Sequence, residues 1–120
     1  MANILIADDS VVIRKTLRRL LVKGGHDVIS EASNGQEAFN EYKLHQPDIV
    51  TLDITMPLMD GIAALKKIIE SFPDARVIMI SAIEQKNLVF EALENGAKHY
   101  IIKPFDEKAV LEIIKLVLEE

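Results

Sequence analysis

The sequence predicts an α/β fold: a five-stranded parallel sheet with helices on both faces, built from five consecutive βα units. Short apolar runs alternate five times with longer stretches whose apolar residues recur at helical spacing. The runs are rich in Val and Ile and nearly continuous, which is typical of strands buried on both faces. A (βα)₈ barrel needs about 200 residues or more. We therefore expect residues 1–120 to form a single domain.

Each βα unit has its own pattern. The predicted strands are Asn3–Ala7, Asp27–Ser30, Asp48–Leu52, Arg76–Ile80 and His99–Ile102. The apolar residues that mark the five helices are, in order, Ile13, Leu17, Leu20 and Leu21; Ala38 and Tyr42; Ile62, Leu65, Ile68 and Ile69; Val89, Ala92 and Leu93; and Val110, Ile113, Ile114 and Val117. The first four helices stop before Gly24-Gly25, Pro47, Pro73 and Asn95-Gly96, and Asp106 is the predicted N-cap of the fifth.

Composition excludes several classes of protein. Without any Cys there are no disulfides, thiolate metal sites or cysteine nucleophiles. The net charge of −5 argues against a general nucleic-acid binder. No apolar run approaches the about 20 residues of a membrane helix, and Met1-Ala2-Asn3-Ile4 lacks the layout of a signal peptide. We expect a soluble cytoplasmic protein with neither nucleic acid nor membrane as partner.

Four of the five predicted strands end on a reactive or charged side chain. These side chains are Asp8 and Asp9 after the first strand, Asp53 after the third, Ser81 after the fourth and Lys103 after the fifth. The second strand ends near Glu31, at the margin of the sheet, and offers no matching short side chain. Ligands of open α/β sheets bind beyond the carboxyl ends of the strands. A capping or solvated role explains any one of these residues, but their joint placement favours a functional site.

Three carboxylates in one cleft repel one another unless a cation lies among them. Mg²⁺ suits such a site because it prefers oxygen ligands and is held by one or two carboxylates, a phosphate and waters. Ligation by carboxylates alone argues against zinc or copper. The three histidines lie on different predicted elements, where surface or packing roles explain them: His26, His45 and His99.

The same residues predict phosphoryl chemistry. A lysine beside a metal, a carboxylate and a hydroxyl resembles a phosphoryl clamp, although a structural ion pair would explain Lys103 alone. A carboxylate can be the nucleophile and form an aspartyl phosphate. We predict Asp53 as nucleophile, with Asp8 and Asp9 as metal binders. Lys103 would neutralise charge, and Ser81 would donate a hydrogen bond to the phosphoryl group.

Four motifs together resemble the response-regulator receiver domain of two-component signalling. They are Ala7-Asp8-Asp9-Ser10, Asp53-Ile54-Thr55-Met56-Pro57-Leu58-Met59-Asp60-Gly61, Ser81-Ala82 and Lys103-Pro104-Phe105. The resemblance covers the whole chain, and within the family the sequence is most similar to the stand-alone chemotaxis regulators. It implies a flavodoxin-like fold with strand order 2-1-3-4-5.

The resemblance also implies roles for single residues. Asp53 would accept a phosphoryl group from a histidine kinase in a reaction that uses Mg²⁺, for which Mn²⁺ could substitute. Asp9 would bind the metal directly and Asp8 through water, with Asp53 and the main-chain carbonyl of Thr55 as further ligands.

For the switch, the resemblance implies that Ser81 moves to bond the phosphoryl group while Lys103 contacts it. Tyr100 would turn inward as Ser81 moves. Pro104 would follow a cis peptide bond. Ser81 replaces the family's frequent Thr but supplies the same hydroxyl.

The resemblance places the output surface on the fourth helix, fifth strand and fifth helix, for a flagellar-motor switch protein or another output protein. Phe90, Leu111 and Leu118 lie off the core stripes of their helices, with extra core packing as the alternative. The first helix carries a basic cluster that is either a solvated face or a docking site for an acidic kinase or phosphatase: Arg14, Lys15, Arg18 and Arg19.

Two residues are candidates for setting the lifetime of the phosphorylated state. Thr55 and Ile83 lie two residues beyond Asp53 and Ser81, respectively, where they could flank the path of an attacking water. Ile83 is apolar and cannot orient water, which predicts slow self-dephosphorylation.

The sequence therefore predicts a phosphorylation-activated switch in chemotaxis, which acts on itself and is no turnover enzyme. A receiver in a phosphorelay or another two-component pathway is an alternative. A second alternative is a Mg²⁺-dependent phosphatase with an aspartyl-phosphate intermediate. Against it, enzymes of the haloacid-dehalogenase type usually have an Asp where this chain has Thr55, and usually a cap domain.

A third alternative is a flavodoxin-like flavin or nucleotide carrier. Against it, the sequence contains neither GxGxxG nor a Walker loop.

Overall fold

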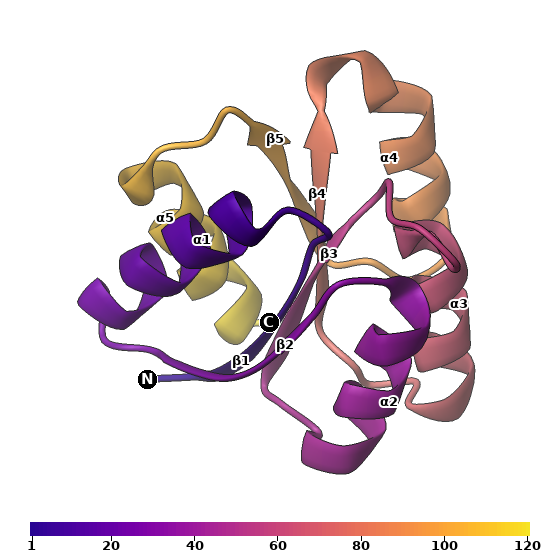
Figure 1. Cartoon of the computed structure of the whole chain (residues 1–120), viewed down its shortest axis with the longest axis horizontal. Coiled ribbons are helices and arrows are strands. Elements are labelled where there is room, and N and C mark those ends of the chain that lie inside the picture. The colour runs from indigo at the N-terminus through magenta and orange to yellow at the C-terminus, as the bar shows by residue number, and fades with distance from the viewer.

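The computed structural model describes residues 1–120 and contains one five-stranded sheet between two layers of helices (Figure 1). Helices α1 and α5 cover one face, and α2, α3 and α4 cover the other. The strands are β1 (Asn3–Ala7), β2 (Asp27–Ala32), β3 (Ile49–Asp53), β4 (Val77–Ala82) and β5 (His99–Lys103). The helices are α1 (Val11–Lys23), α2 (Gly35–His45), α3 (Gly61–Ser71), α4 (Lys86–Glu94) and α5 (Glu107–Leu118), with a 3₁₀ turn at Ile83–Gln85.

All strand pairs are parallel, and the strand order is β2-β1-β3-β4-β5. Both the βα alternation and the order 2-1-3-4-5 are confirmed. The chain leaves β1 toward one edge of the sheet and returns to β3 on the other side of β1. The crevice at the carboxyl ends of β1 and β3 is therefore the point where the order reverses, which is where such sheets bind ligands.

Burial on both faces is confirmed for β1, β3 and β4 but is wrong for β2 and β5. The three inner strands are almost wholly buried, whereas most residues of β2 and β5 are half-exposed. The two partly exposed strands are the edges of the sheet, where helices cover only part of each face. Four strands also run one or two residues further than expected, so that Glu31 lies inside β2, and Asp53, Ser81 and Lys103 lie inside β3, β4 and β5.

Two apolar layers hold the sheet. Residues of α2, α3 and α4 pack on one face, and residues of α1 and α5 pack on the other. Leu111 and Leu118 are half-buried and pack against the second layer, as the core-packing alternative predicts. Phe90 is 66% exposed and does lie on the surface.

Four helices begin with a side-chain cap. The side chains of Ser10, Asn34, Asp60 and Asp106 each accept a hydrogen bond from a backbone N–H in the first turn of α1, α2, α3 and α5. Such a cap contributes about 1 kcal/mol, and the predicted cap at Asp106 is confirmed. None of the helices combines the length and apolar character that crossing a membrane requires.

The start of α3 packs directly against the end of β3. Gly61 donates its N–H to the carbonyl oxygen of Ile54, 2.8 Å away. A Cβ at position 61 would collide with the main-chain carbonyl of Asp53. The turn that follows the candidate nucleophile therefore closes only with glycine at this position.

We expect Gly61→Ala to destabilise the protein by about 2 kcal/mol or more, because backbone must move to admit the methyl group. Gly24→Ala is the matched control, since its Cβ would meet only the flexible side chain of Leu111, and its effect should stay within about 1 kcal/mol. Urea unfolding measures both. Equal stabilities of Gly61→Ala and wild type would contradict the close approach.

Candidate functional site

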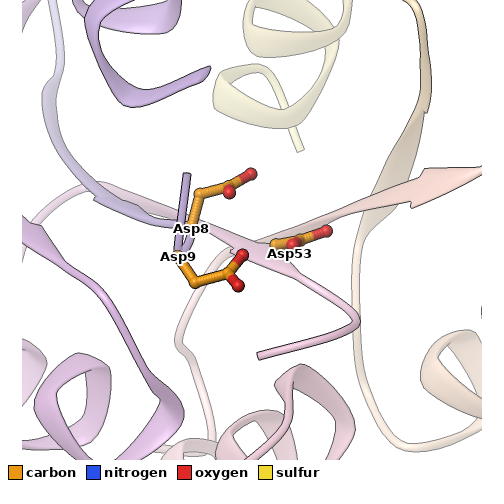
Figure 2. A group of neighbouring side chains, drawn as sticks. All are labelled: Asp8, Asp9 and Asp53. Atoms are coloured by element: carbon orange, nitrogen blue, oxygen red, sulfur yellow. The ribbon is translucent and has the colours of Figure 1, made fainter. Parts of the chain in front are cut away.

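Three carboxylates meet at the carboxyl edge of the sheet, as Figure 2 shows. Asp8 and Asp9 follow β1, and Asp53 is the last residue of β3. One oxygen from each lies within 4.8 Å of the other two. Asp8 is fully buried and Asp53 is 6% exposed, whereas Asp9 is exposed to solvent. The structure thus brings together the three acidic residues expected from the sequence.

Backbone contacts determine the position of Asp8. Its N–H donates to the carbonyl oxygen of Ala32 in β2, at 3.0 Å. Its Oδ1 accepts from the N–H of Ser10, at 2.8 Å, while the Ser10 hydroxyl caps α1. The turn between β1 and α1 therefore holds one carboxylate oxygen of Asp8 and leaves Oδ2 facing the cluster.

Lys103 is the cation of the site. Its Nζ donates to Oδ1 of Asp53 at 3.1 Å and lies 3.3 Å from Oδ2 of Asp8. Lys103 ends β5, two strands away from β3 in the sheet, and the following Lys103–Pro104 peptide bond is cis. One ammonium against three ionised carboxylates leaves two negative charges, which a divalent cation would neutralise.

The charges perturb one another strongly. Burial, and after it the negative charge of Asp8, raise the pKa of Asp53 to about 6, although Lys103 partly opposes the rise. Burial works to lower the pKa of Lys103, but the carboxylates of Asp53 and Asp8 outweigh burial and raise it. The ionised form of Asp53 is therefore less stable than that of a free carboxyl group, and an added cation would stabilise it.

Two buried polar atoms at the site have no hydrogen-bond partner: Oδ2 of Asp8, whose only partner is the ion pair with Lys103, and Oγ of Ser81. Leaving a buried hydroxyl such as that of Ser81 unpaired costs about 1–3 kcal/mol. Oxygen atoms with free lone pairs, grouped with two further carboxylates, are the donors that Mg²⁺ prefers. The residues therefore fit a hard divalent cation, and the free hydroxyl of Ser81 can donate to an additional oxygen ligand.

The rim of the site carries the remaining predicted residues. Thr55 is exposed, and its hydroxyl accepts a hydrogen bond from Nε2 of Gln85 at 2.8 Å. Oε1 of Gln85 accepts from the N–H of Ala82 at 2.7 Å, so one side chain joins the loops after β3 and β4. Ile83 is 66% exposed, and Tyr100 is 37% exposed and faces outward.

Sequence reasoning missed three contributors to this region. Arg14, on α1, donates from Nη1 to the main-chain oxygen of Asp8 at 2.6 Å and from Nε to Glu31 at 3.0 Å. The place of Glu31 on a strand at the margin of the sheet gave no indication of a role at the site. The signal for Gln85 is its place three residues beyond Ala82, which is a capping distance. Arg14 and Arg18 both pair with Glu31, so within the basic cluster only Lys15 and Arg19 are unpaired.

Known proteins share these features. A family model of the response regulator receiver domain matches residues 4–115. The chain is 50% identical to the chemotaxis protein CheY of Bacillus subtilis, over 97% of each chain, and 46% identical to CheY of Thermotoga maritima, over 96% of each. A crystal structure of a CheX–CheY–BeF₃–Mg²⁺ complex from Borrelia burgdorferi contains a chain that is 48% identical, with a TM-score of 0.92, covering 96% of this chain and 87% of that one.

Sequence, fold and acidic site therefore agree, and the chain belongs to the response-regulator receiver family, as a CheY-like switch activated by phosphorylation.

Proposed function

We propose that Asp53 is the phosphoacceptor of this receiver and that a histidine kinase is its donor, with residues 1–120 acting as one receiver domain in chemotaxis. The observation that carries the proposal is the cluster of Asp8, Asp9 and Asp53 with Lys103 at the reversal of strand order. The similarity to two CheY proteins supports the pathway.

In the proposed reaction, an oxygen of ionised Asp53 attacks the phosphorus of a phosphohistidine. The new O–P bond forms as the P–N bond breaks, and the imidazole leaves with the electron pair and takes up a proton. Lys103, already 3.1 Å from Asp53, neutralises charge on the phosphoryl oxygens. Asp53 is the only residue of the protein that gains a covalent bond in this reaction, so the protein acts on itself rather than on an external substrate.

Asp8, Asp9, Asp53 and the main-chain carbonyl of Thr55 would hold the metal. When bound, Mg²⁺ offsets the negative charge of the carboxylates and of the incoming phosphoryl oxygens. Mn²⁺ prefers the same oxygen ligands, and we propose that it can substitute.

The proposed switch begins at Ser81. Its buried hydroxyl has no partner at rest and would donate to a phosphoryl oxygen on Asp53. Movement of Ser81 draws along Ala82, whose N–H is bonded to Gln85. Tyr100 stands outside this loop, half-exposed, and would turn inward as the loop shifts.

The surface formed by α4, β5 and α5 is the proposed output site. A groove there is lined mainly by apolar side chains: Ile83, Lys86, Val89, Phe90, Leu93, Tyr100 and Ile102. Because the proposed movements of Ser81 and Tyr100 would reshape it, a flagellar-motor switch protein or another output protein could distinguish the two states.

Acetyl phosphate with Mg²⁺ should add one phosphoryl group to the wild type and none to Asp53→Asn, because the amide lacks the nucleophilic oxygen. Asp74→Asn is the matched control, since it removes the same charge from an exposed turn. Intact-protein mass spectrometry reads the outcome. Phosphorylation of Asp53→Asn to the wild-type extent would refute the assignment.

Ile83→Glu should lose its phosphoryl group about tenfold faster than wild type, because a carboxylate at this exposed position can orient a water molecule. Ile83→Leu keeps the position apolar and should decay as wild type does. Phosphate release after removal of the donor gives the rates. Identical rates for Ile83→Glu and wild type would remove Ile83 as a lifetime residue.

Mg²⁺ binding should weaken as the pH falls below 6, by about tenfold per pH unit at the limit, because a proton on Asp53 must then be displaced. Above about pH 6, Asp53 is ionised and this competition ends. Calorimetric titration with MgCl₂ measures the change in affinity between about pH 5 and pH 8, a range that extends about one unit or more on either side of the pKa of Asp53. Asp53→Asn should bind more weakly and lose this part of the pH dependence. A Mg²⁺ affinity of the wild type that does not change with pH would contradict the competition between the proton and the metal.

A further inference from the structure

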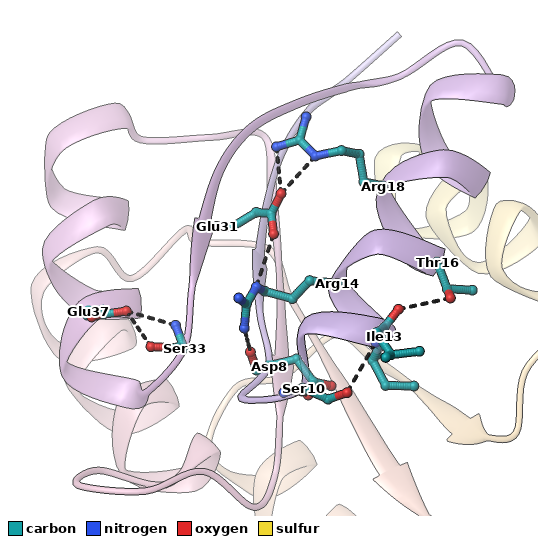
Figure 3. Close-up of polar contacts among 10 residues, drawn as sticks. Asp8, Ser10, Ile13, Arg14, Thr16, Arg18, Glu31, Ser33 and Glu37 are labelled. Carbon is teal, nitrogen blue, oxygen red and sulfur yellow. Dashed lines mark hydrogen bonds and ion pairs between the residues drawn. The ribbon is translucent and has the colours of Figure 1, made fainter.

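Glu31, next to the end of the edge strand β2, holds two arginines of α1 (Figure 3). Its Oε1 accepts from Nε of Arg14 at 3.0 Å, and its Oε2 lies 2.7 Å from both Nε and Nη2 of Arg18. The side chain of Arg14 is 17% exposed, and that of Glu31 is 28% exposed. The Arg14–Glu31 pair is thus the more enclosed of the two and lies on the side of the acidic cluster.

Arg14 makes a second contact with its guanidinium. Nη1 donates to the main-chain oxygen of Asp8 at 2.6 Å. A guanidinium is planar and rigid, so fixing Nε at Glu31 also fixes the direction of Nη1. The position of the Asp8 carbonyl is therefore coupled to β2 through one side chain.

This carbonyl belongs to the peptide that joins Asp8 to Asp9. The N–H of Asp8 is already bonded to Ala32 in β2. The hydrogen bond to Ala32 therefore holds the N–H of Asp8, and the hydrogen bond from Arg14 holds its carbonyl oxygen. The orientation of that peptide sets the directions in which the Asp8 and Asp9 side chains leave the backbone.

We propose that Arg14, anchored by Glu31, is a positioning residue of the metal site, which aims the Asp8 and Asp9 carboxylates toward Asp53. The inference rests on the divalent-cation site of the proposed function. Arg14 touches neither the cation nor the phosphoryl group in this role. Groups that orient metal ligands commonly change metal affinity by about 10–100-fold.

Charge and position predict opposite effects when Arg14 is removed. Its positive charge near the cluster repels a dication, so loss of charge alone would tighten Mg²⁺ binding. Loss of the anchored hydrogen bond would free the Asp8–Asp9 peptide and weaken binding. The sign of the change in Mg²⁺ affinity therefore separates a positioning role from a purely electrostatic one.

The test is a calorimetric titration of MgCl₂ into wild type, Arg14→Met and Arg19→Met. Arg19 lies on the same helix, is exposed and makes no hydrogen bond or ion pair. We expect Arg14→Met to bind Mg²⁺ about tenfold more weakly, with Arg19→Met equal to wild type or slightly tighter. Equal or tighter binding by Arg14→Met would overturn the inference.

Arg14→Lys keeps the charge but cannot span both contacts, so it should also bind Mg²⁺ more weakly than wild type. Wild-type affinity in Arg14→Lys would overturn the role of the Glu31 anchor. Glu31→Gln, which retains Arg14, should increase hydrogen exchange at the buried amide of Asp8, which is bonded to Ala32, and unchanged exchange would count against the anchor. If wild type itself bound no Mg²⁺, the proposed function would fail, which is distinct from equal binding by all variants.

Discussion

Mutual repulsion among three carboxylates is the constraint on which the rest of this structure depends. Asp8, Asp9 and Asp53 offer oxygens within 4.8 Å of one another, and two of the three side chains are buried. In water such charges would move apart. Here the rigid ends of β1 and β3 keep them together, since both strands lie inside the sheet between two apolar layers. Burial and the neighbouring charge of Asp8 together raise the pKa of Asp53, and Lys103 lies where it offsets part of the negative charge. The fit to a divalent cation is a direct consequence, because only added positive charge removes the conflict.

The loops around the cluster connect it to the surface. Ser81 ends in a buried hydroxyl without a partner, and the next residue is bonded to Gln85. Gln85 in turn reaches Thr55 on the loop after β3. A change at Asp53 that attracts Ser81 therefore acts on the hydrogen bonds that Gln85 makes to Ala82 and Thr55. This link through Gln85 is short and leads to the apolar groove of α4 and β5, so a local change in charge can alter a surface that a partner contacts.

Much of the fold was predictable because its signals are local. Apolar runs, helical spacing and the capping residue Asp106 each act within a few positions, and together they give five βα units. The pattern could not show that β2 and β5 are half-exposed, since an edge strand and a central strand can share the same apolar composition. The sequence left core packing of Leu111 as one of two alternatives, because that packing depends on the approach of the turn at Gly24. The acidic residues, Ser81 and Lys103 were found because parallel strands deliver their ends to one side. The contact of Arg14 with Glu31 and Asp8 could not be predicted. It depends on the pairing of β1 with β2, whose register shifts between Ile4 and Leu5.

The free hydroxyl of Ser81 has a consequence for sequence design. A buried group without a partner makes the resting protein less stable than the same fold with alanine at that position. Selection or computation that rewarded thermostability alone would favour this exchange. Under the proposed switch, the more stable molecule would lack the hydroxyl that responds to the phosphoryl group, so resting stability and response make opposite demands on this position.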